Sequence, residues 1–245
     1  MKNDFLLSAF TDIRDDFIME AEKTMTKTKK KLPWKALLIA ALIPILTVTA
    51  YASDFLNVKS LLTGTLHFSS SQYSDMAKAE KKAGFELNAP ETLEDYTFRE
   101  VQVQDVNGLD EEDRQVLKYR EASISYENPD GNPLFYGVHP IQAEIPASDR
   151  AADQVREVNG VKLEYRMDCY WFLPASYEET GLTQEMKDWE KLPGHHITYG
   201  SDEPEQENMG FLTWERDGLR YSLLDMDGVE SPDTLFAMAS QLMTK

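Results

Sequence analysis

The residues able to do chemistry in this chain are few and widely separated. Its four histidines are His67, His139, His195 and His196. A zinc site needs ligands at short repeated spacings such as H-x-x-x-H with a third ligand, and these four do not provide one. His195 and His196 are adjacent, so in a strand their side chains point to opposite faces. We therefore interpret the histidines as structural and expect no metal site and no cofactor.

Nucleophilic, calcium and phosphate chemistry are not indicated either. The chain contains neither the G-x-S-x-G elbow of many serine hydrolases nor a glycine-rich phosphate loop. DVNGLDEED and NPDGNP lack the full calcium-loop pattern with its Glu at the twelfth position, so Asp110–Asp113 is interpreted as a solvated loop. The single cysteine, Cys169, excludes an internal disulfide. These observations favour a protein that is not an enzyme.

Charge is distributed unevenly along the chain. Residues 1–35 carry a net charge of +2, whereas residues 36–245 carry −20. A phosphate backbone needs a basic surface, and the acidic C-terminal part would repel it. Nucleic-acid binding by this part is therefore excluded.

A charge-free apolar stretch follows the basic segment. Residues 36–52, ALLIAALIPILTVTAYA, would span about 26 Å as a helix, which is near the lower limit for crossing a bilayer. Lysines crowd its N-terminal side, and Asp54 is the first charge after it. The positive-inside rule then predicts a single-pass protein of the cell membrane, with its N-terminus in the cytoplasm and its C-terminal domain outside the cytoplasm. The lipid bilayer is the first expected partner.

The same stretch permits a second interpretation. Ala50-Tyr51-Ala52 has the small-x-small pattern of a signal-peptidase site, so an exported binding or scaffold domain could be released after Ala52. Signal peptides usually run to about 15–30 residues, whereas some 35 residues precede this apolar stretch. Length favours the retained anchor, and the cleaved form stays as the alternative.

The N-terminal segment contains an amphipathic pattern. Phe10, Ile13, Phe17 and Ala21 recur at spacings of three and four, which predicts one apolar stripe on a short helix, and Ile18 widens it. A lone helix of this size is marginal in water unless its apolar side packs against something. A protein partner or the membrane surface could cover the stripe, or the helix could simply fray.

Two hairpins are the clearest elements of the C-terminal part. Asn159-Gly160 is a preferred two-residue turn, and strictly alternating apolar residues follow it as far as Leu173. Asp217-Gly218 is a second such turn, which would pair Trp214 with Tyr221. The alternation places Trp171, Trp214 and Cys169 toward the core. Further strands are expected at 97–106, 117–127 and 134–145.

Helices are expected at both ends of this domain. The first follows Ser74 as N-cap and stops at Gly84, and the last follows Ser231 as N-cap. A third is expected at 183–191. The predicted organisation is a cytoplasmic helix and basic flank (1–35), a transmembrane helix (36–52), a tether (53–73) and an extracytoplasmic domain (74–245). The expected fold class is α+β, with one antiparallel sheet and flanking helices.

Several stretches give the whole chain a family resemblance. They are IRDDFIxxA from Ile13 to Ala21, the Lys-rich segment ending in TAYA, GFELNAPETLEDYTF, ITYGSDEPE, and W-x-x-DGLRYSLLDMDG followed by SPDTLFAMA. Together they resemble the anti-sigma-factor-like single-pass membrane proteins of low-GC Gram-positive bacteria, whose extracytoplasmic α+β domain is uncharacterised. Each stretch is a weak signature alone, but together they cover most of the length.

The resemblance implies a membrane-anchored sensor or anti-sigma-like regulator of transcription. Its cytoplasmic helix would contact an extracytoplasmic-function sigma factor. Larger anti-sigma proteins carry a multi-helix cytoplasmic domain, often with a His/Cys zinc motif, and residues 1–35 are too short for that and contain neither residue type. The implied partner-binding residues are Phe10, Ile13, Asp16, Phe17, Ile18 and Ala21.

Overall fold

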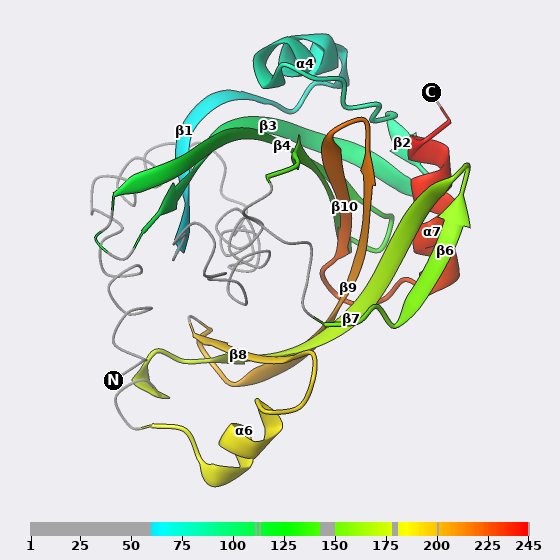
Figure 1. Cartoon of the computed structure of the whole chain (residues 1–245). Coiled ribbons are helices and arrows are strands. Elements are labelled where there is room, and N and C mark those ends of the chain that lie inside the picture. The colour runs from blue at the N-terminus through cyan, green and yellow to red at the C-terminus, as the bar shows by residue number, and fades with distance from the viewer. Residues whose placement is uncertain are drawn as a thin grey trace. The chain divides into compact units, whose positions relative to one another are not determined.

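The computed structural model of the chain describes residues 60–110, 112, 114–142, 150–177, 181–199 and 201–244, with side chains described from residue 64 onward (Figure 1). Its strands are β1 Ser60–Ser70, β2 Thr92–Leu93, β3 Tyr96–Leu109, β4 Gln115–Glu127, β5 Pro133–Pro140, β6 Gln154–Val158, β7 Val161–Leu173, β8 His195–Tyr199, β9 Glu205–Arg216 and β10 Leu219–Asp225. Its helices are η1 Tyr73–Asp75, α4 Met76–Ala83, α6 Gln184–Trp189 and α7 Pro232–Leu242.

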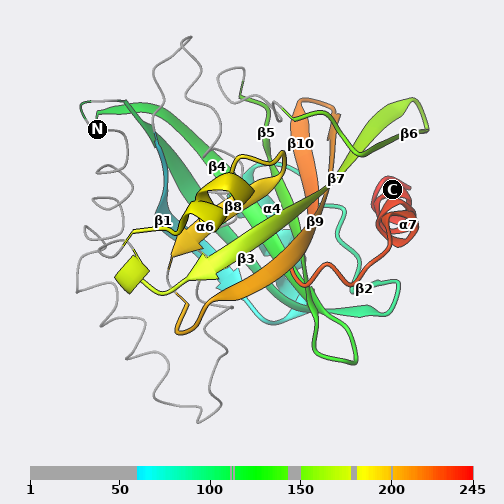
Figure 2. The ribbon, with the colours of Figure 1, turned by 90° about the horizontal axis from the view of Figure 1, so that it is seen from below.

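One sheet holds all ten of these strands. Their order is β1-β3-β4-β5-β10-β9-β7-β6, with β2 beside β3 and β8 beside β7. The sheet curls from β1 round to β8, with α4 and α7 on its outer side (Figure 1). Figure 2, seen from below, shows α6 beside β8 and α7 beyond β9. The helices therefore cover only parts of the outer face.

Local turn chemistry builds two of the hairpins, as predicted. Asn159-Gly160 joins β6 to β7, and Asp217-Gly218 joins β9 to β10. All four turn residues have positive φ angles of 52° to 78°. The type I′ turn needs positive φ at both central positions, and Asn, Asp and Gly adopt it with the least strain. Both predicted turns are confirmed.

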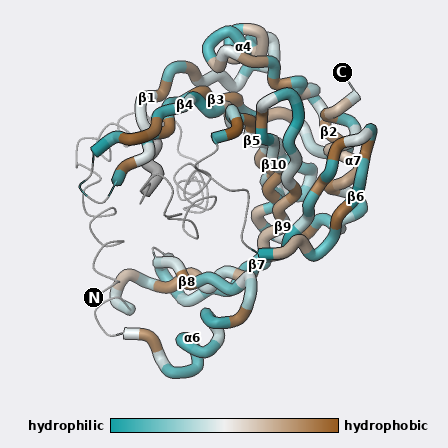
Figure 3. Tube along the Cα trace, in the orientation of Figure 1, coloured by the Kyte–Doolittle hydropathy of each residue, from teal (hydrophilic) through white to brown (hydrophobic). Residues whose placement is uncertain are grey.

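The predicted cross-strand pairs of the second hairpin are also confirmed. Trp214 lies opposite Tyr221, and Leu212 lies opposite Leu223. All four side chains are buried. Hydrophobic and hydrophilic residues alternate along β7, β9 and β10 (Figure 3). This period-two pattern gives each strand one apolar face, and it fixes the register because a one-residue slip would turn that face outward.

The closing helix α7 begins where its capping signal predicts. The Ser231 hydroxyl accepts a hydrogen bond from the Thr234 backbone N–H at 3.1 Å, which satisfies one of the free donors of the first turn. Leu235, Ala239 and Leu242 are all buried. They belong to the main core, so the predicted sheet-facing side of α7 is confirmed.

The two other helices follow their predicted signals in part. α4 ends at Gly84, whose φ of 89° is the left-handed conformation expected there. Ser74 does not cap it, because residues 73–75 form the 3-10 turn η1 and Asp75 occupies the N-cap position. In α6 the Thr183 hydroxyl accepts from the Met186 backbone N–H at 3.2 Å.

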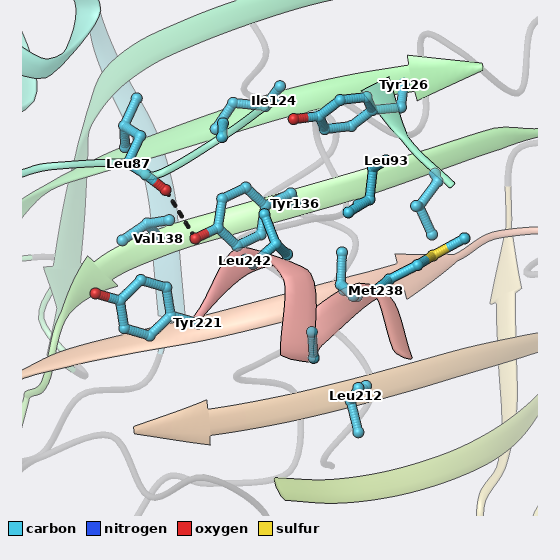
Figure 4. Packing of buried hydrophobic residues seen from close by; sticks show 14 of the residues in the cluster. Leu87, Leu93, Ile124, Tyr126, Tyr136, Val138, Leu212, Tyr221, Met238 and Leu242 are labelled. Carbon is cyan, nitrogen blue, oxygen red and sulfur yellow. Dashed lines mark hydrogen bonds between the residues drawn. The ribbon is translucent and has the colours of Figure 1, made fainter. Parts of the chain in front are cut away.

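The main core lies on the outer face of the sheet, under α4, α7 and residues 85–93. Buried tyrosines connect the sheet to this covering segment. The Tyr136 hydroxyl donates to the Leu87 carbonyl at 2.9 Å (Figure 4), and the Tyr126 hydroxyl donates to the Pro90 carbonyl at 2.9 Å. A buried carbonyl without a hydrogen-bond donor is costly, and each of these phenols supplies the donor. The two bonds therefore fix residues 85–93 against the strands.

The structure corrects the expected fold class. Instead of a transmembrane helix and an α+β domain with an antiparallel sheet, the described residues form mostly one large mixed sheet of ten strands with few helices. None of the helices in these residues is long and apolar enough to cross a bilayer. The predicted membrane segment, 36–52, lies outside them. The expected class, a transmembrane helix followed by an α+β domain, is therefore wrong.

Two strand pairings account for the difference in the sheet. The chain runs through α6 between β7 and β8, and this crossover brings β8 back parallel to β7. Residues 60–70 fall in the stretch expected to be a tether, but they form β1, which pairs with β3. An open sheet edge presents unpaired N–H and C=O groups, and such an edge recruits any extended segment that reaches it.

Candidate functional site

A line of polar side chains crosses the face of the sheet that is turned away from the main core, which we call the inner face. Gln104 lies opposite Glu121, and His139 lies opposite Arg220, which in turn lies opposite Glu215. Ala122 of β4 lies opposite Val138 of β5, and Glu121 and His139 are the next residues of the two strands on the same side of this pair. These five residues, one from each of β3, β4, β5, β10 and β9, are called the polar row.

Strand alternation explains why the row faces inward. On β4 the apolar residues Ala122, Ile124 and Tyr126 are in the core, so the preceding residue, Glu121, must point to the opposite face. Neighbouring strands are about 4.8 Å apart, so the side chains of adjacent row members can contact one another. The row is therefore a direct result of the pairing register.

Most of the row is removed from solvent. The exposed fractions are 9% for Gln104, 4% for Glu121, 9% for His139 and 7% for Arg220. Only the Glu215 side chain, at 46%, is well exposed. Polar groups are costly to bury unless they are paired, so each buried member has to be accounted for.

Glu121 is the least satisfied member of the row. Burial in the protein interior raises the pKa of its carboxyl to about 7, and a hydrogen bond from Gln104 only partly opposes this. Its buried Oε1 atom has no hydrogen-bond partner. The carboxyl therefore takes up or releases a proton close to neutral pH.

His139 is held in its neutral form. Burial lowers its pKa to about 4, and the nearby Arg220 guanidinium contributes in the same direction. Its Nδ1 atom lies 3.0 Å from the Pro140 carbonyl oxygen, which can only accept a hydrogen bond. Nδ1 therefore carries the proton and Nε2 keeps a lone pair. The ring also lies against Tyr119, with the two centroids 5.4 Å apart.

The other end of the row is an ion pair beside a shallow hollow. Arg220 donates from Nε and Nη2 to Glu215 Oε1, at 3.0 and 2.8 Å. A shallow hollow of about 270 Å³ opens at this end of the row. Its lining residues are Lys162, Glu164, Thr213, Trp214, Glu215 and Arg220. A ligand at this end of the inner face would meet the positive charge of Arg220 and the negative charge of Glu215. At the buried end it would meet hydrogen-bond donors and acceptors.

A separate aromatic cluster surrounds β8. Trp189 of α6 stacks on His195 with centroids 4.3 Å apart, and Trp171 meets Trp189 edge-on at 5.5 Å. Trp171 is half-buried and outside the main core, so its predicted place in the core is wrong. Cys169 is half-buried too, and its thiol lies 2.9 Å from Asn208 Oδ1, so it is not the enclosed hydrophobe that the alternation suggested.

The adjacent histidines point to opposite faces, as predicted. His195 lies against Trp189 on the outer side, whereas His196 stacks on Tyr170 with centroids 4.9 Å apart. Within the described ranges, no group of three His, Cys, Asp or Glu side chains is placed to hold a metal ion.

The partner-binding residues predicted from the sequence cannot be placed. Phe10, Ile13, Asp16, Phe17, Ile18 and Ala21 all lie outside the described residues. Comparisons with models of protein families, with characterised proteins and with solved structures found no match. The resemblance to anti-sigma-factor-like proteins therefore stays a prediction.

The polar row was not predicted from the sequence. A signal for it was present, because Glu121 directly precedes the alternating apolar residues of β4 and must lie on their opposite face. Alternation alone cannot show which strands are neighbours, however. The pairing of β5 with β10 joins residues about 80 positions apart in the chain, and that pairing brings His139 to Arg220.

Proposed function

We propose that this chain is a non-catalytic regulator whose sheet domain recognises a polar ligand on its inner face. The polar row is the observation that supports the proposal. Four of its side chains are buried on the face that the main core does not use. Buried, imperfectly paired polar groups reduce stability, and groups with strongly shifted pKa values occur most often at functional sites.

The row favours binding over catalysis by its composition. It offers a carboxyl, a neutral imidazole and a guanidinium that is already paired with Glu215. These groups donate and accept hydrogen bonds from fixed strands, which suits recognition of a polar molecule. In the regulatory proposal, residues 1–35 contact a cytoplasmic sigma factor, and ligand binding by the sheet domain controls that contact.

Ligand recognition by the row is testable through Arg220. We expect some members of a library of small polar compounds to raise the melting temperature of the full chain. A ligand at 100 times its Kd stabilises a protein by about 2.7 kcal/mol, which is about 5–10 °C for a domain of this size. Arg220→Gln should abolish the shift for compounds that bind at the Arg220–Glu215 end of the row, as measured by scanning fluorimetry.

A matched arginine provides the control for this screen. Arg99 also forms an ion pair, with Glu127 at 2.8 Å, but its side chain is 54% exposed and lies outside the polar row. Arg99→Gln should keep every shift that the unmodified chain shows. A compound whose effect survives Arg220→Gln would not bind at the Arg220 end of the row, and a library without any active compound would count against the proposed function.

The regulatory part of the proposal predicts a sigma-factor contact through Phe17. It is the large apolar residue at the centre of the predicted stripe, and helix-in-groove partners are bound by anchors at such spacings. Phe17→Ala should weaken the contact by at least ~2 kcal/mol, roughly thirtyfold. The measurement is recovery of a sigma factor from cytosol by the full chain, with Thr24→Ala as the control. Recovery of equal amounts of sigma factor by Phe17→Ala and Thr24→Ala would remove the regulatory assignment.

A second candidate function is an exported binding domain released after Ala52. It rests on the small-x-small pattern of Ala50-Tyr51-Ala52, which is typical of a signal-peptidase site. Mass spectrometry of the mature chain distinguishes the two candidates. A first residue of Ser53 would favour release, and an intact N-terminus would exclude it.

A further inference from the structure

In the part of the chain that the structure describes, the polar row contains a buried acceptor without a hydrogen-bond partner. Glu121 is 4% exposed, and its Oε1 atom forms no hydrogen bond. Among the described residues, this carboxyl forms no ion pair. The shift of its pKa is caused by burial and by the hydrogen bond from Gln104, and no cation contributes to it. A buried carboxylate oxygen without a donor is costly, so the position is suited to a donor that comes from outside the chain.

Two further acceptors lie next to this oxygen in the register. Gln104, opposite Glu121 on β3, donates its amide N–H to the carboxyl, and the oxygen of the same amide is an acceptor by its chemistry. His139 on β5 uses its Nδ1 proton on the Pro140 carbonyl, so Nε2 is an acceptor. In number, these three acceptors from three adjacent strands equal the three N–H donors of a primary ammonium group.

The surroundings favour an ammonium group over a metal ion. A divalent cation needs several charged or neutral oxygen ligands, and the described residues contain no group of three potential metal ligands. Tyr119 lies two residues from Glu121 on the same side of β4, and its ring contacts His139. Aromatic rings beside a carboxylate attract an organic cation through their negative faces. The net charge of −18 adds a long-range attraction for cations.

The inner-face residues beside the polar row become more exposed toward the ends of β4 and β5. Toward the start of β4 the inner-face residues are Tyr119 and then Leu117, which is half-buried. Ile141, just beyond the end of β5, is 37% exposed. The buried acceptors therefore lie close to the solvent-exposed ends of β4 and β5.

We propose that the inner face binds its ligand through a primary ammonium group, held by Glu121 with Gln104 and His139 as the other acceptors. This inference rests on the proposed function, that the polar row recognises a ligand, and it names the chemical class of that ligand. The aliphatic or aromatic remainder of the ligand would lie against Tyr119 and toward the exposed strand ends.

Binding of this kind is linked to a proton. Among the residues that the structure describes, the ionisable groups of the row nearest Glu121 are Tyr119 on its own strand, His139 on β5 and, one strand further, Arg220 on β10. The neighbouring strand β3 contributes the neutral Gln104. Burial keeps Tyr119 and His139 neutral between pH 6 and 8, because it raises the pKa of the phenol and lowers that of the imidazole to about 4. Of these described groups, the Glu121 carboxyl, with its pKa of about 7, is the one that changes charge in this range. The ammonium group therefore displaces a proton from Glu121 when it binds below pH 7.

The test is calorimetric titration of the full chain with n-butylammonium chloride. Its neutral isostere, butan-1-ol, is the matched probe, and phosphate and HEPES are suitable buffers because neither is a primary amine. We expect affinity for butylammonium to be about tenfold weaker at pH 6 than at pH 8, since the carboxylate fraction falls by about that factor. The binding heat at pH 6 should differ between the two buffers, because a proton is released into them.

Two variants give the proposal its sharpest outcomes. Glu121→Gln keeps the shape of the side chain and is expected to fold stably, so loss of butylammonium binding in it would support the ammonium site. Glu127→Gln, on the same strand and 43% exposed, should bind as the unmodified chain does. Equal binding of butan-1-ol, or undiminished binding by Glu121→Gln, would overturn the proposal. If butylammonium fails but another compound shows an Arg220-dependent shift, the ammonium assignment fails and the proposed function survives.

Discussion

Trp214→Ala is expected to lower the free energy of unfolding by about 3 to 5 kcal/mol, the usual cost of truncating a large buried aromatic side chain. Trp214 is 3% exposed. Its ring stacks on Tyr221, with centroids 5.4 Å apart, and on Tyr136 at 6.3 Å. The truncation would leave a cavity between these rings that the rigid sheet cannot close. Urea denaturation of the full chain measures the loss.

Trp171 provides the comparison for this prediction. It lies on the neighbouring strand β7, but its side chain is half-buried, and its ring meets Trp189 edge-on instead of stacking between two rings. Trp171→Ala should therefore cost clearly less than Trp214→Ala. Equal losses for the two variants would show that the burial assigned to β7 or β9 is wrong.

Glu121→Gln is expected to stabilise the protein by about 3 kcal/mol at pH 8 and by almost nothing at pH 4. The carboxyl has a pKa of about 7 in the folded chain, against an ordinary value of 4.5. The folded state therefore keeps the proton that the unfolded state releases, and stability falls as pH rises from 4.5 to 7. Glutamine resembles the protonated acid, so it avoids the cost of burying the charge.

His139 should oppose this trend over nearly the same range. Its pKa falls from 6.5 to about 4 on folding, so the unfolded state binds the additional proton and stability rises as pH increases from 4 to 6.5. The two slopes nearly cancel in the unmodified chain. Relative to the unmodified chain, Glu121→Gln should gain stability as pH rises through this range and His139→Gln should lose it. Urea midpoints at pH 4, 5, 6, 7 and 8 measure both, and parallel profiles for all three proteins would contradict the assignment.

Short-range features of the fold were predictable from the sequence. The turns at Asn159-Gly160 and Asp217-Gly218 and the cap at Ser231 each depend on a few consecutive residues, and all three are confirmed. The Trp214–Tyr221 pair follows as well, because a two-residue turn fixes the register of the strands that it joins. In each of these features, the residues that determine the backbone conformation and those that determine the side-chain pairing belong to one short segment.

Tertiary structure decided the sheet as a whole and the candidate site. Local patterns did not predict that residues 60–70 form an edge strand, that β8 runs parallel to β7, or that Trp171 is half-buried. The polar row exists only because β5 pairs with β10 across a long stretch of chain. Alternation determines which face each side chain takes, but it carries no information about strand neighbours. Those are chosen by the packing of whole faces, which brought Glu121, His139 and Arg220 into one line.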